Sequence, residues 1–145
     1  MAFDLELLKT YLNEQDRFCK CSNIRLTEIR EGYAEAVLEV EEKHLNGLNV
    51  VQGGAIYTLC DLAFAGAANS RGVKAIGMNA SVSYIRPGTA PLVRAVATEI
   101  SRGKKTVICN VDAFNPEGKL LVRCTMTGFI LGEAFDFPVP APRKN

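Results

Sequence analysis

The chain has 145 residues and a formal net charge of +1, which is enough length for one domain with its own core and too little positive charge for a nucleic-acid-binding protein. Its five cysteines are an odd number, which favours packing thiols in a reducing cytoplasm over a disulfide framework. Apolar runs stay shorter than the roughly 18 residues that a membrane span needs. We therefore expect a single cytoplasmic domain that binds neither nucleic acid nor a membrane.

The beginning of the chain predicts one helix and two strands. A helix over 4–14 can be capped by Asp4, and its leucines recur at helical spacing on one face. Apolar and polar residues then alternate over 24–29 and 33–40, which is the period of a half-buried strand. Glu31-Gly32 is the expected turn between these two strands.

A long apolar segment over 54–68 follows. Only Tyr57, Thr58 and Asp61 carry polar side-chain atoms in it. A helix that is apolar nearly all round is expected to be buried on every side. This segment therefore predicts a central helix. A sheet that curls around it would bury one side, and its remaining apolar surface would meet either solvent or a second subunit.

Four further strands are predicted at 73–86, 92–100, 106–114 and 120–131. The last three are joined by loops of hairpin length and composition, so these strands should be antiparallel. In the first of the four, one side of the strand is expected to carry Ile76, Met78, Ala80, Val82 and Tyr84. The tail over 135–145 contains three prolines and should be extended. The whole order predicts a single α+β domain with its core at about 24–131, in which an antiparallel sheet covers one principal helix.

Asp61 is an anomaly in the apolar helix, because an unpaired buried carboxylate is costly and aspartate is a poor residue for a helix interior. One interpretation is structural: Asp61 lies at the edge of the helix and accepts hydrogen bonds from an arginine or a neighbouring chain end. The other is functional. Gly53 and Gly54 stand where the helix begins, and their free N–H groups can polarise a carbonyl with the help of the helix dipole.

The spacing of these groups has a consequence for the assembly. Seven residues separate Gly54 from Asp61, so the two lie about 10 Å apart along the helix axis. A nucleophile and an oxyanion donor that act on one carbonyl should be only ~4–6 Å apart. If the two features cooperate, Asp61 must come from a two-fold related subunit, and the dimer is obligatory.

Other chemistries lack parts in this sequence. His44 is the only histidine and is expected to be a surface residue in a loop, and no serine-nucleophile, zinc-binding or dinucleotide-binding motif is present. We therefore expect no metal and no cofactor. Arg102, Lys104 and Lys105 surround a predicted hairpin turn, where they are either a solvated tip or a phosphate anchor.

The segment over 44–72 resembles the PaaI-type acyl-CoA thioesterases of the hotdog-fold superfamily, and the resemblance extends over about 24–131. The positions that fall in the register of the family pattern are Asn46-Gly47, Gly53-Gly54, Asp61 and Asn69-Ser70-Arg71-Gly72. The later Ser83-Tyr84-Ile85-Arg86-Pro87 resembles the end of a family strand.

The resemblance implies a hotdog fold, in which a long central helix is wrapped by an antiparallel sheet and the sheets of two protomers join in a homodimer, often paired again into a homotetramer. It also implies an acyl-CoA thioesterase, in which Asp61 is the nucleophile or general base. The amides of Gly53 and Gly54 would polarise the thioester carbonyl, and Asn46 would orient the water or the carbonyl. Coenzyme A is then part of the substrate rather than a cofactor.

The substrate is expected to lie along the central helix, with its acyl group beside the helix and the coenzyme A phosphates near basic residues. The residues expected to bind it are Tyr57, Phe64, Asn79, Ser81, Ser83, Arg86, Arg102, Lys104 and Lys105.

Two positions depart from the family pattern. Gln52 stands where the family commonly has histidine, and it can form hydrogen bonds but cannot take up a proton near neutral pH. Gly77 stands where some relatives have a serine that helps to hold water, so Asn79, Ser81 or Ser83 would have to serve. Two alternatives stay open: a non-catalytic acyl-CoA-binding or regulatory protein on the same fold, and a hotdog dehydratase, for which a histidine after Asp61 is missing.

Overall fold

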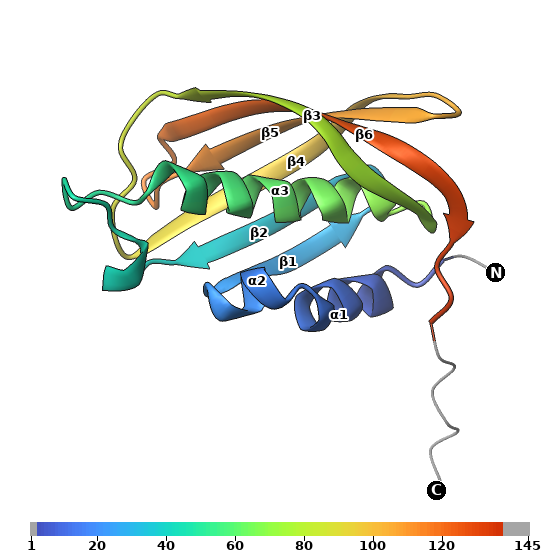
Figure 1. The fold of residues 1–145 in the computed structure, drawn as a ribbon, viewed down its shortest axis with the longest axis horizontal. Helices are drawn as coiled ribbons and strands as arrows, with labels where there is room; N and C mark the ends of the chain where they lie inside the picture. The colour runs from blue at the N-terminus through green and yellow to red at the C-terminus, as the bar shows by residue number, and fades with distance from the viewer. Residues whose placement is uncertain (1–2, 138–145) are drawn as a thin grey trace, which may run out of the picture.

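A six-stranded antiparallel sheet curls around one long helix in the computed structural model, which describes residues 3–137 (Figure 1). The helices of this part of the chain are α1 (Leu5–Gln15), α2 (Arg17–Cys21) and α3 (Gly53–Asn69), with a 3-10 turn η1 (Glu42–His44). The strands are β1 (Ile24–Arg30), β2 (Tyr33–Glu39), β3 (Val73–Tyr84), β4 (Leu92–Arg102), β5 (Thr106–Phe114) and β6 (Leu120–Ala134). The predicted α+β hotdog architecture is confirmed, and α2 is an element that the sequence did not predict.

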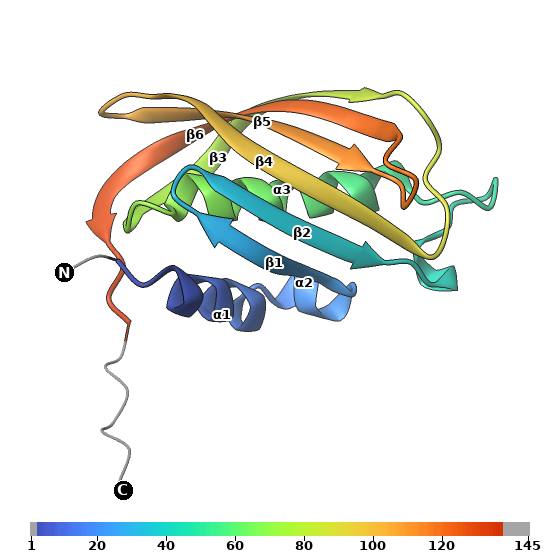
Figure 2. The ribbon, with the colours of Figure 1, turned by 180° about the vertical axis from the view of Figure 1, so that it is seen from behind.

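The strands are arranged in the order β1-β2-β4-β5-β6-β3, and every neighbouring pair is antiparallel. The chain therefore crosses from β3, at one edge of the sheet, to β4 in its middle, a connection visible from behind in Figure 2. The hairpins β4–β5 and β5–β6 form as the loop composition predicts. Among residues 3–137, no helix is both long and apolar enough to cross a membrane.

Helix α3 lies inside the concave face of the sheet (Figure 1). Its inner residues, among them Leu59, Ala63 and Ala67, have no exposed surface. The opposite stripe of the helix is different, because Gly54 and Asp61 are exposed in the protomer. In the protomer the sheet therefore buries one side of the helix, as expected, and the stripe that carries Asp61 stays open to solvent or to a second subunit (Figure 1).

The segment after α3 fixes the C-terminal end of the helix. The Asn69 side chain accepts a hydrogen bond from the Ala75 N–H at 2.8 Å, and the Ser70 hydroxyl accepts one from the Gly32 N–H at 2.8 Å. Arg71 forms ion pairs with carboxylates of the β1–β2 turn and of β4. These contacts give the Asn69-Ser70-Arg71 part of the family pattern a structural role, since they lie at the opposite end of α3 from Gly53.

Strand β3 does not alternate throughout its length as predicted. Its pairing with β6 shifts register between Gly77 and Asn79, which leaves Met78 in a bulge. A Cβ at Gly77 would meet the side chains of Asp61 and Phe64 on α3, whereas the neighbouring Ile76 is 55% exposed. The bulge changes which residues face the helix, so Ile76 is not on the inner side with Ala80 and Val82.

The two ends of the described chain pack together. The rings of Phe135 and Phe137 lie 5.4 Å apart and stack, and each also contacts Phe3 and Tyr11 near α1. The first residues of the predicted extended tail are thus anchored to the N-terminal helix, and the rest of that tail lies outside the described residues.

Gly66 lies where α3 packs closely against the sheet. A Cβ at this position would lie 2.8 Å from the Cβ of Ala34 and 2.9 Å from a methyl group of Leu26. We expect Gly66→Ala to lower the free energy of unfolding by about 1–3 kcal/mol through overpacking, although alanine is the better helix former. Urea unfolding at one fixed protein concentration measures this.

Gly47→Ala is the matched control, because a Cβ at Gly47 has no atom within 4 Å. It should leave the unfolding midpoint nearly unchanged. A stability of Gly66→Ala equal to or above that of the wild type would contradict the close approach.

Candidate functional site

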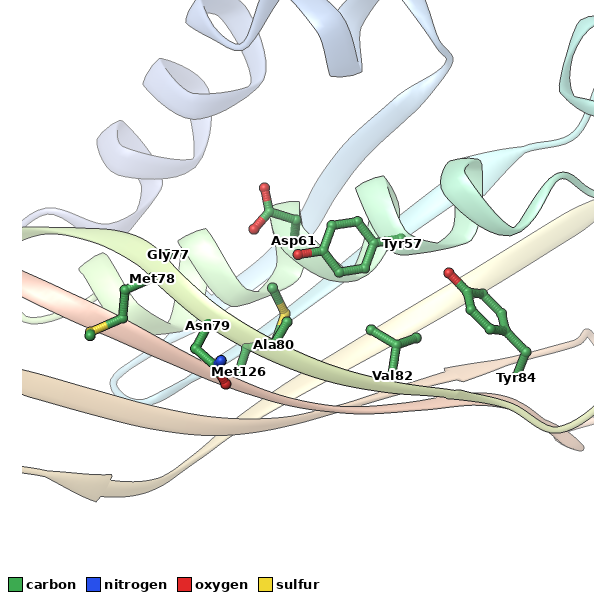
Figure 3. Close-up of a pocket in the computed structure, with 9 residues that line it drawn as sticks. All are labelled: Tyr57, Asp61, Gly77, Met78, Asn79, Ala80, Val82, Tyr84 and Met126. Carbon is green, nitrogen blue, oxygen red and sulfur yellow. The ribbon is translucent and has the colours of Figure 1, made fainter.

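Asp61 lies beside a cavity of about 710 Å³ between α3 and β3 (Figure 3). The cavity is open to solvent at the edge of the sheet where β3 has no neighbouring strand. It is lined by Tyr57, Asp61, Gly77, Met78, Asn79, Ala80, Val82, Tyr84 and Met126. Figure 3 shows the Tyr57 hydroxyl pointing along the helix toward the Asp61 carboxylate.

The Asp61 carboxylate has no hydrogen bond and no ion pair with any side chain or backbone group among residues 3–137, and the arginine partner considered in the structural interpretation is not found there. Its pKa is raised above the ordinary value of an aspartate, first by desolvation among the surrounding protein atoms and second by the negative charge of Asp16. A carboxylate that is unpaired and made more basic by its surroundings is suited to act as a base or nucleophile.

The raised pKa predicts a cost in stability. Because the folded-state pKa of Asp61 lies above the unfolded value, its charged form destabilises the fold at neutral pH, and this effect disappears as the pH falls below the unfolded value. We expect Asp61→Asn to raise the thermal midpoint at pH 7, with a gain that shrinks toward zero near pH 3.5. Thermal unfolding across this pH range measures the gain, and a variant less stable than wild type at pH 7 would contradict the expectation.

The start of α3 lies two turns away from Asp61 on the same helix. Gln52 is the N-cap, and its side-chain oxygen accepts a hydrogen bond from the Gly54 N–H. Because Gly54 is the donor, the Gln52 amide must present its oxygen to the helix, and its NH₂ group is left to point outward. The Gly53 N–H has no hydrogen-bond partner among residues 3–137. We predicted free N–H groups at both glycines. The Gly54 N–H is instead bonded to Gln52, so the donors left at the start of the helix are the Gly53 N–H and the Gln52 NH₂ group.

One protomer does not bring these donors to its own Asp61. Gly53, Gly54 and Asp61 belong to one continuous helix, in which seven or eight residues correspond to roughly 10–12 Å along the axis. The cavity beside Asp61 is lined by neither glycine. The geometric argument for a site shared between two protomers therefore stays a prediction.

Asn46 organises the loop that precedes α3. Its side-chain oxygen accepts hydrogen bonds from the N–H groups of Leu48, at 2.9 Å, and Val50, at 3.4 Å. Its backbone N–H donates to the Val50 carbonyl at 2.8 Å. The side-chain oxygen is thus used within the loop, and only the NH₂ group of Asn46 is left for a ligand.

His44 is not the surface residue that its place in a loop predicts, because it is only 5% exposed. The Glu41 N–H donates to its Nδ1 at 2.9 Å, so Nδ1 carries no proton. Its Nε2 then donates to the Ser22 carbonyl at 2.7 Å. His44 therefore joins η1 to the end of α2 as a neutral ring, and this structural role explains a lone buried histidine.

The predicted uncharged substrate-binding residues separate into three places. Tyr57 and Asn79 line the cavity beside Asp61. Phe64 is only 2% exposed and packs over Gly128, so it belongs to the core rather than to the cavity wall. Ser81 and Ser83 alternate with cavity-lining residues of β3 and therefore lie on the opposite face of the sheet.

The predicted basic residues are also divided. Arg86 lines a smaller cavity of about 290 Å³ that includes Gly53 and Tyr84. Arg102 lies at the other end of α3, where it donates to the Ala68 carbonyl at 3.1 Å and contacts Glu99. Lys104 and Lys105 are exposed in the β4–β5 hairpin. Arg86 is thus the one predicted cation that the structure brings next to the start of α3.

Sequence reasoning missed a third cavity, of about 460 Å³, on the other side of the α3 start. Its walls include Phe18, Ser22, Ile24, Lys43, His44, Gln52, Gly54, Ala55 and Thr58. Phe18 lies on α2, an element that was not predicted, and no local pattern shows that α2 lies next to the α3 start. The available signal was a phenylalanine in a short segment with several charged residues, Asp16, Arg17 and Lys20.

Gly77 leaves space next to the Asp61 carboxylate. A Cβ at Gly77 would lie 3.8 Å from Asp61 Oδ1 and 3.9 Å from the Phe64 ring, which are ordinary contact distances. We expect Gly77→Ser to fold normally and to lower the pKa of Asp61, because the new hydroxyl can donate a hydrogen bond to the charged form. Carbon-13 NMR of the aspartate side chains against pH measures this. Gly77→Ala, which adds volume without a donor, should not lower the pKa; an unchanged pKa in Gly77→Ser would contradict the placement.

Comparisons with known proteins show which family the chain resembles. The model of the family described as thioesterase superfamily matches residues 48–122, which is about half of the chain. An Archaeoglobus fulgidus protein described as a candidate esterase is 34% identical over 135 residues, which are 92% of this chain and 86% of that protein. The acyl-coenzyme A thioesterase PaaI of Escherichia coli is 32% identical over 107 residues, which are 73% of this chain and 76% of that protein.

A solved structure shows the same fold. The structure of the E. coli PaaI protein from the phenylacetic acid degradation operon has a TM-score of 0.84 at 26% identity, and the match covers 90% of this chain and 96% of that one. The chain therefore belongs to the thioesterase superfamily. The predictions of a thioester hydrolase with the hotdog fold and of a resemblance to PaaI are confirmed.

Proposed function

We propose that this protein is a cytoplasmic acyl-CoA thioesterase whose active site is formed by Asp61 of one protomer and the start of α3 of another. The observation that carries the proposal is the unpaired Asp61 carboxylate beside an open cavity, on the face of α3 that the sheet leaves uncovered. The relationship to the acyl-coenzyme A thioesterase PaaI of E. coli supports acyl-CoA as the substrate class.

The chemistry is hydrolysis of the thioester bond. Asp61 acts as general base or nucleophile: as a base it takes a proton from water while the water oxygen adds to the carbonyl carbon. The Gly53 N–H and the Gln52 NH₂ stabilise the negative charge on the carbonyl oxygen. The C–S bond then breaks, the proton passes to the sulfur, and the free acid and coenzyme A leave. These steps use side chains and backbone groups of the protein and invoke no cofactor.

The open edge of β3 provides the arrangement that this chemistry needs. If β3 pairs with β3 of a second copy around a two-fold axis, the sheets join and the uncovered stripes of the two α3 helices approach each other in opposite directions. Asp61 of each protomer then meets Gly53 of the other, and each homodimer holds two sites. A further pairing of dimers gives the homotetramer expected for this type of protein.

In this proposal the coenzyme A arm lies on the side of Arg86. The guanidinium donates to the Leu120 carbonyl at 2.9 Å and keeps further N–H groups for a phosphate. Lys104 and Lys105 extend this role only if the partner protomer brings their hairpin close to the site.

A non-catalytic acyl-CoA-binding protein is the second candidate, because Gln52 already occupies the Gly54 N–H. It would bind acyl-CoA without turnover.

Mixing two inactive variants tests the shared site. Asp61→Asn removes the base, and Gly53→Pro removes one amide at the first helical position, where Gln52 with φ −58° and ψ 131° is compatible with a following proline. We expect each variant alone to lose at least about 100-fold in kcat. After unfolding and refolding together, heterodimers should regain activity, because one of their two sites has both intact parts.

Each variant unfolded and refolded alone is the control and should stay inactive. Absence of recovery in mixtures that form heterodimers would show that the site lies within one protomer. Unchanged turnover by Asp61→Asn would refute its role, and acyl-CoA binding without turnover by the wild type would support the non-catalytic candidate.

A further inference from the structure

The third cavity, beside α2, indicates what kind of acyl group the protein selects, an inference that rests on the proposed thioesterase function. This cavity of about 460 Å³ has Gln52 and Gly54 in its wall. If the thioester carbonyl is held at the start of α3, the group attached to that carbonyl can therefore extend directly into the cavity. Its volume lies within the range of about 300–1,000 Å³ that is usual for small-molecule sites. The remaining walls include Ile24, Ala55 and Thr58, which present mainly carbon atoms.

Phe18 stands at the mouth of this cavity and is 68% exposed. It lies next to Cys19, which is only 3% exposed, so α2 is docked on the core while its neighbouring aromatic side chain is left in solvent. An exposed aromatic ring beside a cavity whose accessible surface is more apolar than polar is a surface that a bound ligand can cover.

The position of α2 is fixed by polar contacts at both ends. At its start, Asp16 accepts a hydrogen bond from the Cys19 N–H at 3.0 Å. At its end, the His44 ring donates to the Ser22 carbonyl, and the Lys43 ammonium donates to the Cys21 carbonyl at 3.0 Å. Phe18 therefore lies on a helix whose position is fixed. A side chain that selects among ligands needs such a rigid support.

The two sides of the α3 start differ in a way that separates the two arms of a thioester. On one side lies the smaller cavity with Arg86, whose free N–H groups suit a phosphate. On the α2 side, the ammonium in the cavity wall, that of Lys43, is already bonded to two oxygens of the chain. The coenzyme A arm fits the Arg86 side, and the acyl arm fits the side of Phe18.

The extent of the match to the thioesterase superfamily also supports separate positions for the reacting groups and for the wall that contacts the acyl group. Residues 48–122 contain Gln52, Gly53 and Asp61, but not Phe18 or Ile24. The parts proposed to carry out the reaction thus lie in the shared segment, whereas one wall of the α2-side cavity comes from outside it. Selection of the acyl group can then differ between relatives while the chemistry stays the same.

We propose that Phe18 is a specificity-determining residue, and that the α2-side cavity takes a bulky apolar acyl group, preferably an aromatic one that packs against the Phe18 ring, rather than an acetyl group.

Kinetics with two substrates test this proposal. Phenylacetyl-CoA and acetyl-CoA serve as probes for the full-length wild type, Phe18→Ala and Phe18→Leu. The wild type should prefer phenylacetyl-CoA in kcat/KM. Phe18→Ala should lose about tenfold or more for phenylacetyl-CoA and change less than about twofold for acetyl-CoA, with Phe18→Leu between the two. Ile100→Ala removes another exposed apolar side chain, 54% exposed on β4, and should leave both values unchanged.

Equal losses for both substrates in Phe18→Ala, or an unchanged ratio, would overturn the assignment. Failure of the thioesterase proposal itself is recognised separately, as absence of hydrolysis of either substrate by the wild type. Calorimetry with the non-hydrolysable thioethers S-phenacyl-CoA and S-acetonyl-CoA then measures binding without turnover, which tests the contact with Phe18 directly. Weaker binding of only the phenacyl compound by Phe18→Ala supports the proposal, and equal affinity of the wild type for both compounds refutes it.

Discussion

The packing of one apolar helix against one curved sheet is the constraint on which the rest of this structure depends. The sheet buries the inner side of α3 so closely that Gly66 has no room for a side chain. It cannot enclose the opposite side, because the sheet does not close on itself and β3 has a neighbouring strand on one side only. A stripe of helix surface therefore stays uncovered, and Asp61 lies on that stripe. The same geometry that creates the core thus leaves a charged group where a second molecule can reach it.

Much of the fold follows from periodicity. Strand alternation and turn residues are local properties, so strand β5 and the turn at Gly32 agree with their predicted positions. The short helix α2 and the bulge at Met78 were not predictable, because a single extra residue or a five-residue helix leaves no periodic signal. For the same reason, hydrophobicity indicated that α3 is central but not which of its faces the sheet leaves open.

The site was predictable in its residue types but not in its hydrogen bonds. The sequence indicates that Gln52, Gly54 and Asp61 can bear chemistry, and the fold places all three on or next to the open stripe. Which amide is free depends on the conformation of the Gln52 side chain, and that is a matter of tertiary structure. Arg102 shows the opposite outcome, since a hairpin arginine that suits a phosphate is instead held by the α3 carboxyl end.

Asp61 and Phe18 are both residues whose local environment is unfavourable in the isolated protomer. The desolvated charge beside the like charge of Asp16 raises the free energy of the fold, and the aromatic ring in solvent contributes little of the stabilisation that its burial would give. Neither is compensated by a contact within the part of the chain that the structure describes, and both lie around the same helix. Proteins retain such residues where binding or reaction makes use of them, because selection acts on function above a threshold of stability. The carboxylate lies in the segment shared with the superfamily and the ring lies outside it, which agrees with a common reaction and a separate choice of substrate.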